Sequence, residues 1–172
     1  MKKLLEWENS TNMHPHGVCE AATMLWLCRI DNTGLQHALE LRPEECDDLQ
    51  KGVESGKVSW IFSLSHMLGK GSTFSATKHL PIERATIANL KVGEFLYIAA
   101  SSGANGHAIA VHRHSAGIFF FNPGQGIYFL RESDSEINEL ANLIEKVCGL
   151  ESTARIGVLR SPAYQMPRFY GG

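Results

Sequence analysis

The sequence predicts an α+β protein in which a buried N-terminal helix packs on a C-terminal antiparallel sheet. Three observations carry this prediction. Residues 19–30 are apolar on nearly all sides, which is typical of a short buried helix. From about residue 95 the pattern changes to short apolar runs separated by turn residues, as in strands. Residues 134–148 then show the amphipathic spacing of a helix.

Length and composition indicate one globular domain. The 172 residues suffice for a sizeable core, and we expect a single domain over 1–172 with a loosely held tail from about residue 161. A net charge of -2 gives no indication of a nucleic-acid partner. The start of the chain turns acidic by Glu6 with no apolar run after it, so we expect no secretory signal, and no stretch is long enough for a membrane span.

Taken in order, residues 1–18 predict a short helix or extended arm and then a polar loop at 9–12. The buried helix ends near the turn residues 31–34. A surface helix or helix pair is expected over 35–54, and a second core helix over 58–69 that stops at 69–72. The helix over 134–148 has Ser133 as its N-cap and Glu136 as capping-box partner. The sheet of four or five strands is expected to use residues 95–100, 107–113, 117–121, 127–130 and 154–160.

The cysteines and histidines favour neither a disulfide framework nor a metal site. Cys19, Cys28, Cys46 and Cys148 contain no close Cys-x-x-Cys pair, so we expect four free thiols. Two histidine pairs have ligand-like spacing, His14 with His16 and His112 with His114. No third ligand stands near the first pair, and we expect neither a metal nor another cofactor.

Cys19 lies in the first turn of the buried helix, directly after Gly17 and Val18. A helix N-terminus carries the positive pole of the helix and unpaired N–H groups, which favour a thiolate and can hold an oxyanion. The position therefore suits a nucleophile, although a cysteine at a helix start can also serve only to pack the core.

A thiol nucleophile needs a base, and the base needs an orienting partner. His107 begins a strand after a Gly-containing loop, and Asn122 ends the next strand before a Pro-Gly turn. If His114-Ser115 is a two-residue hairpin tip, His107 directly faces Asn122, with Cβ atoms about 5 Å apart. A structural histidine and a turn-forming asparagine are the alternative roles of these two residues.

Three segments together resemble the papain-like fold, in particular the bacterial effector proteases of the YopT and AvrPphB type. They are residues 17–27, 106–111 and 119–126. In that family a Gly-x-Cys opens the central helix, a His-Ala motif starts a strand, and a Phe-Asp-Pro-Asn-x-Gly motif ends the next strand. The resemblance implies a catalytic set of Cys19, His107 and Asn122, with Asn122 where the family usually has Asp.

The side chain of the oxyanion hole, a few residues before the cysteine, has no obvious counterpart in this chain. Asn12 is the candidate, and His14 and His16 are its rivals.

The resemblance implies a cysteine protease, or more broadly a thiol amidohydrolase, that acts on a protein or peptide substrate. Such a protein would be a bacterial effector or toxin, cytoplasmic before delivery and then secreted or translocated into a target cell without a signal peptide. A cognate immunity protein or a chaperone would be a further partner. The same acyl-enzyme chemistry would also serve a glutamine deamidase or a peptidoglycan amidase. A catalytically inactive binding module on the same fold is the remaining alternative.

Overall fold

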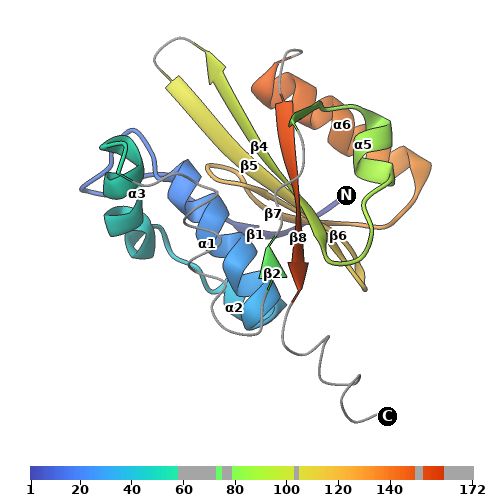
Figure 1. Ribbon diagram of the computed structural model, residues 1–172, viewed down its shortest axis with the longest axis horizontal. Coiled ribbons are helices and arrows are strands. Elements are labelled where there is room, and N and C mark those ends of the chain that lie inside the picture. Colours follow the sequence, from blue (N-terminus) through green and yellow to red (C-terminus); the bar gives the residue numbers. More distant parts are fainter. Residues whose placement is uncertain (58–72, 75–78, 103–104, 150–152, 161–172) are drawn as a thin grey trace.

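The computed structural model describes residues 1–57, 73–74, 79–102, 105–149 and 153–160. Its centre is an antiparallel sheet with strand order β1-β7-β6-β5-β4-β8-β2, and β3 also pairs with β8 (Figure 1). The strands are β1 (Lys2–Glu6), β2 (Thr73–Phe74), β3 (His79–Pro81), β4 (Glu94–Ser102), β5 (Asn105–His114), β6 (Gly117–Asn122), β7 (Gly126–Leu130) and β8 (Thr153–Arg160). The helices are α1 (Cys19–Asn32), α2 (Leu35–Leu39), the 3₁₀ helix η1 (Pro43–Cys46), α3 (Asp47–Glu54), α5 (Arg84–Ala88) and α6 (Asp134–Cys148).

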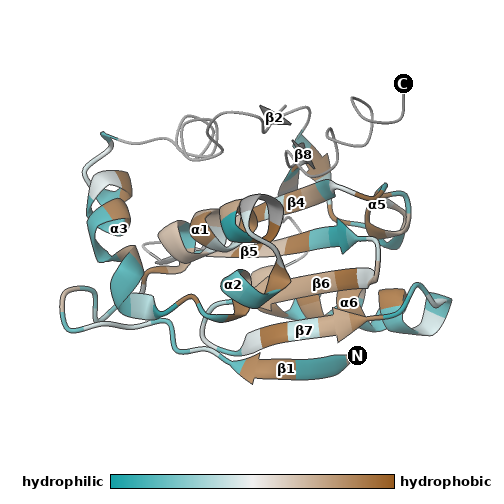
Figure 2. Ribbon diagram, turned by 90° about the horizontal axis from the view of Figure 1, so that it is seen from below, coloured by the Kyte–Doolittle hydropathy of each residue, from teal (hydrophilic) through white to brown (hydrophobic). Residues whose placement is uncertain are grey.

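Helices cover both faces of the sheet. Helices α1, α2 and α3 lie on one face, and α5 and α6 lie on the other (Figures 1 and 2). Because side chains alternate along a strand, β6 sends Phe119 and Phe121 toward α1 and Phe120 toward α6. All six residues of β6 are buried, which explains why its sequence is a continuous apolar run.

Helix α1 is buried along β5, as the sequence predicts. Ala21, Ala22, Met24 and Leu27 are fully buried. The Thr23 hydroxyl donates to the Ala108 carbonyl at 3.1 Å. This alignment brings the N-terminus of α1 to the start of β5, the two places where the sequence puts Cys19 and His107.

The structure decides two alternatives that the sequence left open, in favour of an extended arm at the start of the chain and a helix pair over 35–54, and it adds elements that the sequence pattern did not indicate. Residues 2–6 form an edge strand paired with β7. Strands β2 and β3 and helix α5 fall in a stretch, 73–94, for which no element was predicted. The segment 35–54 is a pair of helices separated by a 3₁₀ turn. The predicted helix over 58–69 and the tail from 161 lie outside the described residues.

The predicted tip of the β5–β6 hairpin is wrong. His114 pairs with Gly117, so the turn is Ser115-Ala116 and not His114-Ser115. The His114 ring favours this turn because its Nδ1 accepts the Ala116 N–H at 3.1 Å. The error moves the register by two residues, and a shift of two leaves every side chain on its predicted face. His107 and Asn122 are therefore diagonal neighbours on one face, not directly opposite.

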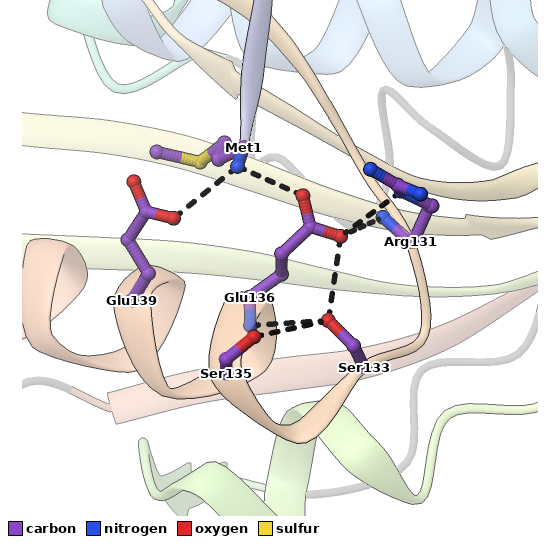
Figure 3. Close-up of polar contacts among 6 residues, drawn as sticks. All are labelled: Met1, Arg131, Ser133, Ser135, Glu136 and Glu139. Atoms are coloured by element: carbon purple, nitrogen blue, oxygen red, sulfur yellow. Dashed lines mark hydrogen bonds and ion pairs between the residues drawn. The ribbon is translucent and has the colours of Figure 1, made fainter.

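The N-cap of α6 is confirmed, and it also ties down the start of the chain (Figure 3). The Glu136 N–H donates to the Ser133 hydroxyl at 3.3 Å. The Glu136 carboxylate accepts from the Met1 ammonium and from the Arg131 N–H, each at 2.8 Å. The first turn of α6 thereby holds the start of edge strand β1 in place.

A buried histidine on β5 makes the protein sensitive to acid. His112 is 4% exposed between Phe95 and Phe119, and burial, with a smaller effect of His114, lowers its pKa to about 3. The unfolded chain, with an ordinary histidine pKa, binds more protons below pH 6.5, so stability falls as pH drops from there toward 3. We expect this one group to remove on the order of 4 kcal/mol of unfolding free energy by pH 3.5.

Urea unfolding between pH 7 and pH 3.5 measures this effect. His112→Leu should flatten the dependence on pH, whereas His79→Leu, at an exposed position, should leave it unchanged. Equal slopes in the wild type and His112→Leu would contradict the assignment.

Candidate active site

Cys19 is the first residue of α1 and is only 7% exposed. Its Sγ lies 3.8 Å from the carbonyl oxygen of Gly106, the residue immediately before His107. Within the described residues, this backbone oxygen, not the His107 ring, is the hydrogen-bond partner of the thiol. The nucleophile candidate thus sits against the backbone that carries the candidate base.

His107 and Asn122 are joined by a short hydrogen bond. The His107 Nε2 and the Asn122 Oδ1 are 2.7 Å apart. Because an amide oxygen only accepts, Nε2 is the donor, and the lone pair of a neutral ring is then on Nδ1. The Asn122 Nδ2 donates to the Gln125 Oε1 at 3.0 Å, so the amide is held at both ends.

Gln125 is a residue that the sequence reasoning missed as part of this site. It lies in the turn after Asn122, within the motif 119–126, and its proximity follows from the three-residue loop between Asn122 and Gly126. Asn122 itself is 1% exposed. A buried and doubly bonded amide has one orientation, which fixes the orientation of the His107 ring in turn.

The expectation that the helix start lowers the Cys19 pKa is wrong. Burial raises the pKa of this thiol, and the charge of Glu20 acts in the same direction. Backbone hydrogen bonds at Ala108, Glu20 and Cys19 oppose the shift without reversing it. The thiol is therefore protonated at neutral pH, and it needs a base to become a nucleophile.

Asn9 lies against the segment that immediately precedes Cys19. Its Oδ1 and its backbone oxygen both accept the Val18 N–H at 3.1 Å. Its Nδ2 is 2.7 Å from where a Cβ on Gly17 would be, and its Cβ is 3.5 Å from the equivalent point on Gly124. Asn9 thus bridges the segment before Cys19 and the turn after Asn122.

Asn12 and its rivals are placed elsewhere. Asn12 is exposed and lines a surface hollow with Met13, Glu44 and Asp47, a hollow whose lining does not include Cys19. The buried His14 pairs through Nδ1 with Asp47 at 2.8 Å and through Nε2 with Glu54 at 3.5 Å, so it fastens the loop to α3. His16 is exposed. The signal that could have favoured Asn9 is the polar loop 9–12 itself, which offers two asparagines.

Gly17 permits this arrangement, and its replacement should disrupt it. Gly17 has φ of +124°, a conformation that favours glycine, and an added Cβ would meet the Asn9 amide. We expect Gly17→Ala to displace Asn9 and to lower the reactivity of Cys19 toward iodoacetamide. Gly56→Ala, at a positive φ in open space, is the matched control because it shares the backbone strain without the contact. Unchanged Cys19 reactivity in Gly17→Ala would show that Asn9 does not shape the site.

The described residues hold no group of three or more His, Cys, Asp or Glu side chains arranged to bind a metal ion. The structure places Cys19, Cys28, Cys46 and Cys148, all among the described residues, outside any disulfide. None of the described helices combines the length and the apolar composition that a membrane crossing requires.

Comparison with known proteins gives a match at the level of fold. No family model matches the sequence, and no curated protein resembles it significantly. The structure is similar to the crystal structure of Pseudomonas avirulence protein AvrPphB, with a TM-score of 0.59 and 12% sequence identity. The match covers 87% of this chain and 95% of that chain. At this identity the similarity shows a mixed helix and antiparallel-sheet fold in common, and the chemistry rests on the residues described above.

Proposed function

We propose that the chain is a papain-like cysteine protease whose catalytic residues are Cys19, His107 and Asn122. The observation that carries the proposal is the 2.7 Å bond from His107 to Asn122, made on the strand whose first residues touch the Cys19 sulfur. An oriented imidazole beside a thiol at a helix start is the arrangement that nucleophilic catalysis at an amide requires.

The reaction follows from these positions. The His107 Nδ1 takes the thiol proton as Sγ attacks the carbonyl carbon, and the carbonyl oxygen becomes an oxyanion. The Cys19 N–H and the Asn9 Nδ2 are the donors for this oxygen. The imidazolium then gives its proton to the leaving amine, so the C–N bond breaks and a thioester remains. A water molecule, deprotonated by His107, hydrolyses the thioester and restores the thiol.

The environment of the Cys19 thiol determines how Cys19 and His107 would react together. Asn122 is neutral and orients the ring without stabilising its charged form. Since burial also raises the Cys19 pKa, the resting thiol is protonated. His107 therefore acts as a general base during attack, and no thiolate–imidazolium pair is held in advance.

A role as a bacterial effector is part of the proposal. The three sequence motifs resemble the effector proteases of the YopT and AvrPphB type, and the structural match is to a Pseudomonas avirulence protein. Both favour a substrate that is a protein of a target cell.

The test is incubation of a mixture of denatured proteins of known sequence with the wild type and with Cys19→Ser. We expect new peptide termini and lower intact masses with the wild type alone. A gain of about 1 Da at glutamine, without chain cleavage, would instead identify deamidation by the same acyl-enzyme chemistry. Identical spectra for the two proteins would contradict a thiol hydrolase.

A further inference from the structure

Glu20 is a charged residue directly beside Cys19 that the proposed chemistry does not use. It follows Cys19 in the first turn of α1 and is half-buried. Its Oε1 lies 3.9 Å from the point where a Cβ on Gly106 would be. Gly106 is exposed, and its carbonyl oxygen is the atom that the Cys19 sulfur contacts. The carboxylate and the sulfur therefore lie against the same residue at the solvent boundary.

The carboxylate has no counter-charge in the part of the chain that the structure describes. No hydrogen bond or ion pair is made there by Glu20, and the charge that shifts its pKa is that of another carboxylate, Glu54. Burial and Glu54 both raise the pKa of Glu20. On β4, the pKa of Tyr97 is raised by burial and by the charges of Glu20 and Cys19, while Arg155, its partner residue on β8, acts in the opposite direction. The N-terminus of α1 favours a carboxylate in its first turn, but no cationic side chain among the described residues pairs with Glu20.

We propose that Glu20 selects a cationic substrate residue, a lysine or arginine next to the attacked carbonyl, and that this pairing helps to activate Cys19. The inference rests on the proposed thiol hydrolase function. A carboxylate beside the nucleophile attracts a cation to the reacting centre, and partial burial strengthens that attraction relative to water.

The activation of Cys19 would come from the electrostatic interaction between Glu20 and the thiol. The negative charge of Glu20 opposes formation of the thiolate. A substrate cation that pairs with Glu20 cancels this opposition, so the thiol loses its proton more readily when the correct substrate is bound. Binding by a cationic residue would then raise turnover as well as affinity.

Two thiol reagents of similar size and opposite charge test the selection without a known substrate. They are the trimethylammonium-ethyl and the sulfonato-ethyl methanethiosulfonates, with the uncharged methyl compound as reference. The rate at each cysteine is read by peptide mapping in the wild type, in Glu20→Gln, and in Glu40→Gln, an exposed control at the C-cap of α2. Cys148, at the end of α6, is the internal reference in every sample.

We expect the ratio of cationic to anionic rates at Cys19 to fall about tenfold in Glu20→Gln. The uncharged reagent should react faster in Glu20→Gln than in the wild type, because the opposing charge is gone. The ratio at Cys148 should not change, and Glu40→Gln should behave as the wild type. An unchanged ratio at Cys19 in a folded Glu20→Gln protein would overturn the proposal.

Cleavage-site mapping separates this inference from the proposed function. With the denatured protein mixture, wild-type cleavage should be enriched beside lysine and arginine, and Glu20→Gln should lose the enrichment. Cleavage that depends on Cys19 but shows no such enrichment would overturn the role of Glu20 and leave the protease proposal intact. Charge selection at Cys19 without any hydrolysis would support Glu20 as the selecting group and contradict the protease.

Discussion

Replacement of Cys19 by alanine is expected to lower turnover by about 1,000-fold or more, and replacement of His107 by alanine should have a similar effect. In the proposed reaction the Cys19 sulfur forms the bond to substrate, and since the thiol is protonated at rest, loss of the proposed base would leave an unreactive nucleophile. Neither change should unfold the protein, because Cys19 is small and His107 is only half-buried at a strand end.

The measurement is kcat/KM on a peptide found by the cleavage mapping, with thermal melting as the control for folding. Residues that act as a unit are not additive, so the double variant should be little worse than either single variant. Near-normal turnover in a folded His107→Ala protein would exclude His107 as the base.

Asn122→Ala should lower kcat/KM by about tenfold to 100-fold, because the imidazole loses the group that fixes its orientation. Asn122→Asp should retain most activity, since it keeps the oxygen that accepts from Nε2. The carboxylate also stabilises the imidazolium, so the acidic limb of the pH profile should move to higher pH. A shift of the basic limb would instead indicate that the resting site holds a thiolate–imidazolium pair.

Gln125→Ala provides the comparison for these variants. It removes the second contact of the Asn122 amide and leaves the His107 bond in place. Its activity should lie between those of the wild type and Asn122→Ala. If Asn122→Ala matches the wild type at every pH, Asn122 is only a turn residue before Pro123, and the site is a dyad with another orienting group.

The sequence predicted well where local patterns decide the structure. The span of α6 is the predicted 134–148, because Ser133 and Gly149 mark its two ends. Helix α1 and strand β6 were predictable because each is a continuous apolar run, and such a run is stable only when it is buried on all sides. The placement of the two side chains on one face survived a wrong hairpin tip, because the register error was an even number of residues.

Tertiary proximity explains what the sequence left out. Asn9 reaches the site because the loop folds back onto Gly17 and Gly124, contacts that no spacing in the sequence specifies. Asn12, only three positions later, faces α3 for the same reason. The Cys19 pKa was misjudged because burial and Glu20 outweigh the helix terminus, and the degree of burial is a property of the packed fold.

If His107 activates Cys19, the rate of Cys19 alkylation depends on the His107 ring. Iodoacetamide labelling is followed by peptide mapping in the wild type, in His107→Ala, and in His16→Ala, whose histidine is exposed. Cys46 is the reference within each sample, because burial raises its pKa to about 12. We predict that Cys19 is labelled before Cys46 and that His107→Ala alone slows it by about tenfold or more at pH 7. Equal Cys19 rates in the wild type and His107→Ala, or earlier labelling of Cys46, would contradict the claim.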